Sequence, residues 1–192
     1  MFYRIVRAIV YAYMHVRFRI AIKGLENIPE GGCILAMNHT SNYDPVMVGI
    51  HTPRKMHTMA KEELFANRLF GKILSELGAF PIKRGKGDIR SLKTSIRLVQ
   101  EGNIFAIFIE GTRSKTGEMQ VPKKGVGFIT TKSKSPVIPT YIYGVKGGWF
   151  ARAGVVFGEP LQFESTDYEE VTNEIAAAIK QLADEQRERP SA

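Results

Sequence analysis

The sequence predicts an α/β protein of a single domain, in which helices flank a central sheet that is mostly parallel or mixed. Segments with strand patterns alternate with segments of helical periodicity along most of the chain. The run Ile104–Ile109 is apolar without interruption, which is typical of a strand covered on both faces of its sheet. With 192 residues, 44% of them hydrophobic and 24% charged, the chain suits one core, and it contains no repeat or dividing linker.

A short amphipathic helix is expected over residues 1–15, ahead of the domain proper at 16–192. Its apolar residues recur at helical spacing beside Arg4 and Arg7; they are Phe2, Ile5, Val6, Ile9, Val10 and Tyr13. This pattern fits a helix lying at a lipid surface, and equally a helix packed on the domain. The longest charge-free run, Ala8 to Val16, is shorter than a bilayer requires, and no cleavage site follows it. We therefore expect neither a transmembrane span nor a secretory signal.

Two strands and a helix are predicted for the next part of the chain. Residues 16–22 alternate apolar and polar side chains, which indicates a half-exposed strand that ends at Gly24. A second strand is expected from Cys33 to His39. A short helix should follow Pro45 and lead to a strand near residues 55–60.

The remaining elements continue the alternation of helix and strand. Residues 62–77 predict two helical pieces that stop at Gly78, and Asp88 is a suitable N-cap for a helix that closes at Gly102. The strand 104–109 then delivers Glu110 to the edge of the sheet. Further strands are expected at 137–143 and 155–157, followed by an amphipathic helix at 168–187.

The charge of the chain limits the classes of partner. A formal charge of +8 and a pI near 9.6 favour a polyanion: nucleic acid, anionic lipid or a phosphorylated substrate. Residues 164–192 carry a net −5, so the positive surface belongs to the first 163 residues. A lone cysteine excludes an internal disulfide and suits a reducing compartment, and the four histidines lack metal-ligand spacing. We expect no metal ion.

His39 and Asp44 form the most informative pair of residues, because they lie five positions apart just after an apolar strand. A turn there could bring the carboxylate to one imidazole nitrogen and leave the other free to take a proton from an alcohol. Asp44 also precedes Pro45 and is a suitable N-cap for the following helix. A covalent route through Cys33 or Ser41 is a further alternative, but Cys33 lies inside an apolar strand and Ser41 lacks a nucleophile elbow.

Two other segments carry residues suited to binding a phosphate. Lys83, Arg84 and Lys86 follow an expected strand end among glycines, where they form either an anion site or a solvated basic loop. In the second segment, Arg113 could grip a phosphate, and the amides of Gly111 and Thr112 could face a substrate oxygen. Glu110 begins that segment at the end of an apolar strand, where a carboxylate needs a partner or a purpose.

These segments together resemble the bacterial 1-acylglycerol-3-phosphate acyltransferases of the glycerolipid acyltransferase family. Four family blocks occur in the family's order: Asn38-His39 through Asp44, Gly78 to Arg84, Phe108 to Arg113, and Ser135 to Pro139. The third block has Ile109 where proline is usual. The N-terminal segment is shorter than in members with a two-helix anchor, so membrane contact is expected more strongly than stable insertion.

The resemblance implies a glycerol-3-phosphate acyltransferase-like fold and acyl transfer from acyl-CoA or acyl carrier protein to the sn-2 hydroxyl of lysophosphatidic acid, giving phosphatidic acid for phospholipid synthesis. His39 would act as the base and Asp44 would orient it. Lys83, Arg84 and Arg113 would hold the phosphate, and residues 110–112 would face the acceptor or the oxyanion, with Lys83 assisting. The block at 135–139 would line the acyl pocket or support a strand. No cofactor is implied.

The expected location is the cytoplasmic face of the cell membrane, peripheral or monotopic. The expected partners are lysophosphatidic acid, the acyl thioester, the membrane surface and, as a candidate, acyl carrier protein. Nucleic acid is not expected, because no reading helix, zinc spacing or stacking-aromatic signature is present. The alternatives are an acyltransferase for another lysophospholipid or lipid alcohol, and a non-catalytic basic protein that binds membranes or nucleic acid.

Overall fold

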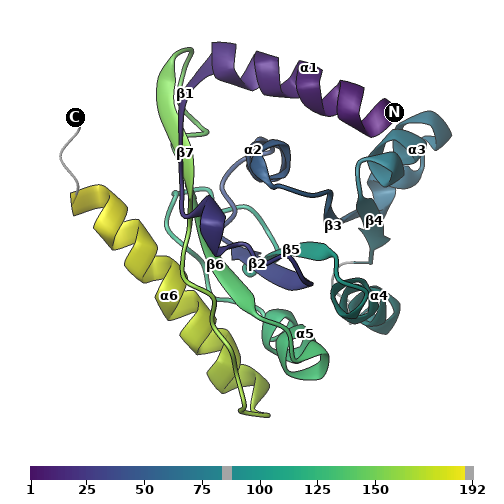
Figure 1. The fold of residues 1–192 in the computed structure, drawn as a ribbon, viewed down its shortest axis with the longest axis vertical. Coiled ribbons are helices and arrows are strands. Elements are labelled where there is room, and N and C mark those ends of the chain that lie inside the picture. The colour runs from purple at the N-terminus through teal and green to yellow at the C-terminus, as the bar shows by residue number, and fades with distance from the viewer. Residues whose placement is uncertain (84–87, 189–192) are drawn as a thin grey trace.

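The computed structural model describes residues 1–83 and 88–188, and its seven strands form one mixed sheet in the order β1-β7-β6-β2-β5-β3-β4 (Figure 1). The predicted fold class is confirmed. The central strand β2 (Cys33–Met37) is parallel to its neighbours β5 (Ile104–Phe108) and β6 (Val137–Tyr143). Beyond β5, the strands β3 (Met56–Lys61) and β4 (Ala79–Ile82) keep the same direction.

The other side of the sheet reverses direction. β7 (Ala151–Phe157) runs antiparallel to β6, and β1 (Phe18–Lys23) runs parallel to β7. The carboxyl ends of the five parallel strands therefore meet at one edge of the sheet, and β1 and β7 begin at that same edge. In open α/β sheets, ligands bind beyond the carboxyl ends of the strands.

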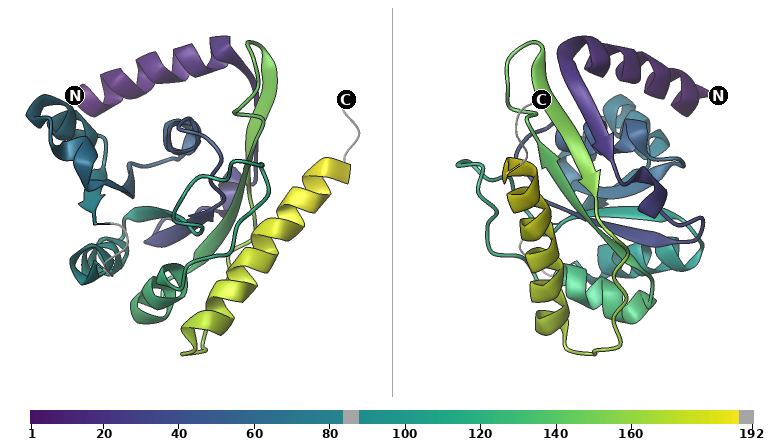
Figure 2. Two further views of the ribbon diagram at one scale, coloured as in Figure 1. Left: turned by 180° about the vertical axis from the view of Figure 1, so that it is seen from behind. Right: turned by 60° about the vertical axis from the view of Figure 1, so that its left-hand side comes forward.

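Helices cover both faces of the sheet. On one face lie α1 (Phe2–Arg17) and α2 (Asp44–His51), and on the other lie α4 (Ile89–Gln100), α5 (Gly125–Ser133) and α6 (Tyr168–Glu188) (Figures 1 and 2). The shorter elements are η1 (Leu25–Asn27), η2 (Glu62–Phe65) and α3 (Arg68–Glu76).

The central strands are buried on both of these faces. In β2, Leu35 and Met37 pack with Met47 of α2, while Ile34 and Ala36 pack with residues of α5 and α6. This two-sided burial explains the uninterrupted apolar runs of β2 and β5.

Helix α1 combines the two alternatives that its pattern left open. Met14 is fully buried and Val10 packs against the core, so one stripe of the helix does rest on the domain. The opposite stripe is apolar as well and faces outward; we call Phe2, Ile5, Ile9 and Val16 the α1 stripe. None of the described helices combines the length and apolar content that crossing a bilayer requires.

Most predicted elements agree with the structure to within a few residues. The pattern at 16–22 misplaced one boundary, because Val16 belongs to α1 and the strand begins at Phe18. Helix α5 went unpredicted, since its sequence contains two glycines and two threonines, which disfavour helices. Its Gly127 is needed because a Cβ atom there would collide with the Tyr168 carbonyl oxygen of α6.

Candidate active site

The register of the central strands brings two sequence-distant residues together. Met37 of β2 is paired with Phe108 of β5, so the two chains leave the sheet side by side. The Ile109 N–H donates to the Met37 carbonyl (3.1 Å) and continues the pairing by one step. His39 and Glu110 consequently become neighbours, although they are 71 positions apart.

His39 and Asp44 form the hydrogen-bonded pair that their spacing predicted. His39 Nδ1 lies 2.8 Å from Asp44 Oδ2, and the Asp44 side chain is fully buried. In the described part of the chain, the other ring nitrogen, Nε2, has no hydrogen-bond partner. The ring therefore has one nitrogen held by a carboxylate and one available to a substrate.

The loop between these two residues is built around the same carboxylate oxygen. Asp44 Oδ2 also accepts the backbone N–H groups of Thr40 (2.6 Å) and Ser41 (2.7 Å). Asp44 does not cap the helix as the alternative proposed, because its side chain turns back toward the loop and makes no capping bond to α2. Oδ1 is buried without a described partner, so the hydrogen bonds of the carboxylate are concentrated on the oxygen that faces His39.

Glu110 holds the backbone of this loop. Only 1% of the residue is exposed, Oε1 accepts the His39 N–H (2.8 Å), and Oε2 accepts the Gln120 N–H (2.9 Å). A buried carboxylate is stabilised by charge-assisted bonds of this kind. Both oxygens of Glu110 are bound to backbone amides, so the residue is suited to position His39. Because the carboxylate is buried and already bonded, it is less suited to contact the acceptor directly.

The imidazole of His39 is further fixed by an aromatic ring. It stacks on Phe108, with the ring centroids 3.8 Å apart and the planes inclined by 19°. His39 is only 8% exposed. Stacking on one side and hydrogen bonding at Nδ1 restrict the ring to a single orientation, as a general base requires.

Arg113 lies close to the loop between His39 and Asp44. Its Nη1 donates to Asn42 Oδ1 (2.8 Å), which links the third block to the first, and the side chain remains exposed. The Gly111 N–H already donates to the Phe108 carbonyl (3.0 Å) in a turn where Gly111 has a φ of 68°. That amide is committed to the turn, so the amides of Thr112 and Arg113 become the candidate donors for an oxyanion.

Lys83 lies at the same edge of the sheet but farther along it. It follows β4, which is separated from β2 by β5 and β3, a distance of about 14 Å between strand axes at the usual strand spacing. Its ammonium group lies 3.6 Å from Glu62 in an exposed pair. Lys83 is therefore placed for the far end of a substrate and is poorly placed for the oxyanion. Arg84 and Lys86 lie outside the described residues.

Asp88 ties the Lys83 segment to helix α4. Its carboxylate accepts the N–H groups of Lys83 (3.0 Å) and Ser91 (3.1 Å) and the hydroxyl of Ser91 (2.8 Å). The bond from the Lys83 amide, followed by those from Ser91, lowers the pKa of Asp88 from 3.8 to about 2. The predicted N-cap at Asp88 is confirmed, and the same carboxylate also holds the backbone of Lys83.

The residues considered for a covalent route have unsuitable surroundings. Cys33 is fully buried, and burial raises the pKa of its thiol to about 11, against a small opposing effect of Arg54. Such a thiol is protonated at neutral pH and unreactive. The Ser41 hydroxyl accepts the Tyr43 N–H (3.2 Å) and no described base contacts it.

Several residues that support the site were not identified from the sequence. Asn38 exchanges two hydrogen bonds with the backbone of Ile142 (3.0 and 2.8 Å) and so fixes the end of β2 against β6. Lys146 donates to the Ser114 carbonyl (2.9 Å), and the Ser114 N–H donates to the His39 carbonyl (2.8 Å). Asn38 lies within the first block and could have been noticed, whereas nothing in the sequence marks Lys146.

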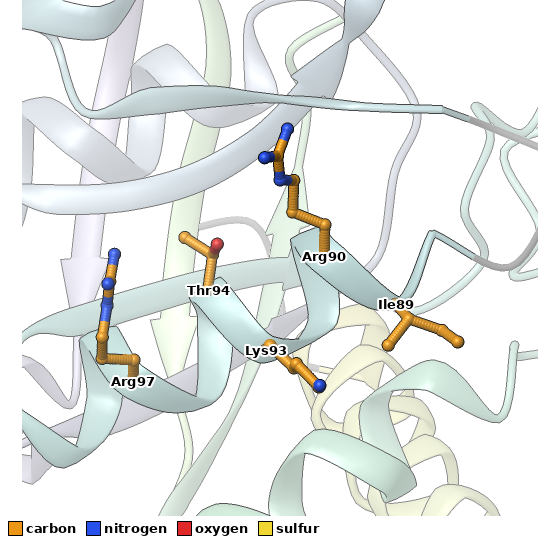
Figure 3. A pocket seen from close by; sticks show the side chains of 5 residues that line it. All are labelled: Ile89, Arg90, Lys93, Thr94 and Arg97. Atoms are coloured by element: carbon orange, nitrogen blue, oxygen red, sulfur yellow. The ribbon is translucent and has the colours of Figure 1, made fainter.

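A shallow depression of about 590 Å³ lies outside this cluster, on helix α4 (Figure 3). Arg90, Thr94 and Arg97 extend from one side of the helix, and Ile89 and Lys93 from another. Because α4 begins just after the Lys83 segment, its three cations extend the positive charge of that end of the sheet. A depression of about 500 Å³ on α1 is lined by Met1, Arg4, Ile5 and Ala8.

The described residues contain no group of three or more His, Cys, Asp or Glu side chains that could hold a metal ion.

The fourth sequence block lies mainly in β6, where Val137, Ile138 and Pro139 are buried beside β2. Of the two roles expected for residues 135–139, this buried location favours support of a strand.

Comparison with known proteins gives consistent matches. A family model described as Acyltransferase matches residues 19–143. The 1-acyl-sn-glycerol-3-phosphate acyltransferase of Bacillus subtilis (strain 168) is 33% identical over 154 residues, which cover 77% of this chain and 76% of that protein. The enzyme of the same name from Pseudomonas aeruginosa is 29% identical over 157 residues, covering 76% of this chain and 60% of that protein.

A solved structure extends the similarity to almost the whole chain. The crystal structure of the 1-acyl-sn-glycerophosphate (LPA) acyltransferase PlsC from Thermotoga maritima superimposes with a TM-score of 0.81 at 25% identity. The match covers 99% of this chain and 81% of that one.

Proposed function

This chain belongs to the acyltransferase family, and on that basis we propose that it transfers a fatty acyl group from an acyl thioester to the sn-2 hydroxyl of 1-acylglycerol-3-phosphate, yielding phosphatidic acid. The observation that carries the proposal is the 2.8 Å contact between His39 Nδ1 and Asp44 Oδ2 at the carboxyl edge of the sheet. The names of the relatives support the choice of a phosphorylated lysolipid as acceptor.

In the proposed reaction His39 acts as the general base. Its Nε2 removes the proton of the sn-2 hydroxyl while the oxygen attacks the thioester carbonyl, and Asp44 stabilises the imidazolium that forms. Collapse of the tetrahedral intermediate breaks the carbon–sulfur bond, and the imidazolium returns its proton to the leaving thiolate. General base catalysis of this kind contributes roughly 10²- to 10⁴-fold.

The negative oxygen of the intermediate requires hydrogen-bond donors. The Thr112 and Arg113 amides are the candidates, since both residues follow the Gly111 turn beside the His39 loop. One preorganised donor in an oxyanion hole contributes about 3 kcal/mol. Arg113, together with Lys83 and Arg84, would hold the acceptor's phosphate and position its hydroxyl.

The acyl donor is a thioester of coenzyme A or of acyl carrier protein, and both carry negative charge. The cations of α4 that line the depression in Figure 3, namely Arg90, Lys93 and Arg97, offer a complementary surface for the charged part of either donor. Neither a resident cofactor nor a metal ion takes part in this scheme.

Helix α1 provides the proposed contact with the membrane. The α1 stripe is exposed, with Ile9 at 64% and Val16 at 60%, and the cations Arg4 and Arg7 lie on the same helix. Arg4 is exposed, whereas Arg7 is half-buried and donates to the carbonyls of Ile50 and Thr52. The exposed apolar stripe is therefore the feature that supports contact with a lipid surface. We place the protein peripherally at the cytoplasmic face of the cell membrane, where its acceptor resides.

A matrix of donors and acceptors tests the proposal. Acyl-CoA and acyl carrier protein thioesters are offered with lysophosphatidic acid, another lysophospholipid or neutral monoacylglycerol, and the products are identified by mass. We expect phosphatidic acid from the wild type and none above background from His39→Ala, with His57→Ala as the matched control. Transfer only to a different acceptor would replace the proposed substrate, and an active His39→Ala protein would contradict the mechanism.

A further inference from the structure

Two large aromatic side chains stand exposed next to each other in the connection between β6 and β7. Trp149 is 61% exposed, Phe150 is 62% exposed, and their ring centroids are 6.4 Å apart. Adjacent exposed aromatic side chains of this size are characteristic of surfaces that contact a partner or a membrane. The acyl-transfer chemistry at His39 makes no use of them.

The backbone of this turn is held in an unusual conformation. Phe150 has a φ of 61°, which residues other than glycine rarely adopt. Its N–H donates to the Arg17 carbonyl (2.9 Å), and the Arg17 guanidinium donates to the carbonyls of Gly147 (2.8 Å) and Gly148. The strain is thus maintained by specific bonds while the rings it positions remain outside the core, a pattern found at functional sites.

The turn is continuous with the exposed side of α1. The guanidinium of Arg17, the last residue of α1, lies 5.1 Å from the Trp149 ring centroid, and the Tyr13 ring packs edge-on against Trp149 at 6.5 Å. In Figures 1 and 2 the connection between β6 and β7 reaches the C-terminal end of α1. The two aromatic rings and the α1 stripe therefore belong to neighbouring parts of one surface.

The charge of these segments selects the kind of partner. Neither residues 1–25 nor residues 119–158 contain an aspartate or a glutamate. The exposed cations of α1, β1 and β7 are Arg4, Arg19 and Arg152. Arg7, Arg17 and Lys146 donate to backbone carbonyls, and Lys23 lies at the other end of β1. Aromatic rings and arginines without acidic neighbours match the interface of an anionic bilayer, where rings lie among headgroups and cations meet phosphates.

We propose that the Trp149–Phe150 turn is a second lipid-contacting element, which inserts into the headgroup region of an anionic bilayer beside α1. The same connection contains Lys146, which is bonded to the Ser114 carbonyl behind His39. A second contact beside the C-terminal end of α1 fixes the orientation of the domain on the lipid, whereas α1 alone would let the domain rotate about the helix axis. The inference rests on the proposed function, because the bilayer supplies the acceptor.

The chain contains a single tryptophan, so its fluorescence reports this site alone. The full-length protein is mixed with vesicles of phosphatidylcholine and phosphatidylglycerol, with and without lipids brominated on the acyl chains. We expect a blue shift of the emission and quenching by the brominated lipids. Vesicle-bound protein whose Trp149 emission is unshifted and unquenched would overturn the inference, as would a complete lack of vesicle binding.

Variants give a second measurement. Trp149→Ala combined with Phe150→Ala should lower partitioning onto these vesicles by about tenfold, because both rings lose their apolar contact. Leu25→Ala, in η1 at the opposite edge of the sheet, is the matched control and should leave partitioning unchanged. Equal partitioning of the double variant and the wild type, or a lipid-free dimer that the double variant abolishes, would contradict the proposal.

Activity on a short-chain, monodisperse acceptor separates the two proposals. The Trp149→Ala/Phe150→Ala variant should retain wild-type turnover with that acceptor and lose activity only with vesicle-borne acceptor. If the wild type transfers no acyl group to any acceptor, the proposed function fails. If it transfers normally while Trp149 does not respond to vesicles, only the lipid contact at the turn fails.

Discussion

The loops around His39 and the outward side of α1 differ in how far their side chains are hydrogen-bonded or buried by the rest of the protein. Around His39, the buried carboxylates of Asp44 and Glu110 accept four backbone amides, and the imidazole is both stacked and hydrogen-bonded. On α1, large apolar side chains such as Ile9 stand exposed, and none of the described residues covers them. The first region is preorganised by the fold, whereas the second is the region for which we propose a partner.

This comparison implies that substitutions in the two regions affect different measured properties. Substitutions around His39 should change turnover and leave vesicle binding alone, whereas substitutions on α1 or at Trp149 should do the reverse. A variant that changes both would indicate that docking and catalysis are coupled through the connection containing Lys146.

After the loss of His39 itself, the largest effect is expected from Asp44→Asn. The amide cannot stabilise an imidazolium, and its NH₂ group can occupy the position that now accepts three hydrogen bonds. Turnover should fall by roughly 10²- to 10⁴-fold, with vesicle partitioning unchanged. Steady-state kinetics and vesicle sedimentation check the two halves of this expectation. A turnover number within threefold of the wild type would remove the orienting role of Asp44.

Glu110→Gln is expected to give the next largest effect. Either the His39 or the Gln120 amide would then face an NH₂ donor instead of a carboxylate oxygen, which leaves a buried donor unpaired. Turnover should fall about tenfold, and the free energy of unfolding by about 1–3 kcal/mol. Denaturant unfolding and kinetics measure these quantities. Glu118→Gln, in the same loop but exposed, is the matched control, and equal behaviour of the two variants would refute the positioning role.

Arg113→Ala should act mainly on substrate binding. Removing a guanidinium that holds the acceptor's phosphate should raise the apparent Michaelis constant for that acceptor about tenfold and alter turnover less. Asn42→Ala should have the same effect in weaker form, because Asn42 only orients Arg113. An unchanged Michaelis constant in Arg113→Ala would assign the phosphate to other cations.

The smallest expected effect concerns stability and its dependence on pH. Asp88 has a folded-state pKa of about 2 against an ordinary value of 3.8, so its ionised form stabilises the folded state. The advantage of the wild type over Asp88→Asn should be complete above pH 3.8 and disappear as the pH falls toward 2. Denaturant midpoints measured across this range test it. A difference that does not depend on pH would show that the charge of Asp88 is unimportant.

The pairing of His39 with Asp44 could be predicted from the sequence, because the two residues are local. His39 and Asp44 are five residues apart, so a single turn brings them together, and the apolar run before them marks the strand that carries them. Glu110 was identified as unusual on the same grounds, but its partners were not, because His39 and Gln120 are joined to it only through strand pairing and a long loop.

Prediction was weakest where a residue acts through distant contacts. The Gly111 amide was assigned to substrate, yet it donates to the Phe108 carbonyl in the turn. Lys83 was considered for the oxyanion, and it follows a strand that two others separate from β2. Helix α5 could not be recognised because of its two glycines, of which Gly127 is needed where the backbone of α6 approaches closely. Such features depend on what packs opposite a residue, and no local pattern encodes that.

The sequence by itself determined the alternation of strands and helices, the His39–Asp44 pair and the basic character of the body, because each follows from neighbouring residues or from composition. Only the tertiary structure decided that Glu110 supports the His39 backbone, that α1 is apolar on both its packed and its exposed stripes, and that Trp149 lies beside Arg17. The physical reason is strand order: β7 returns beside β1 at the carboxyl edge, so residues more than a hundred positions apart come to share one surface.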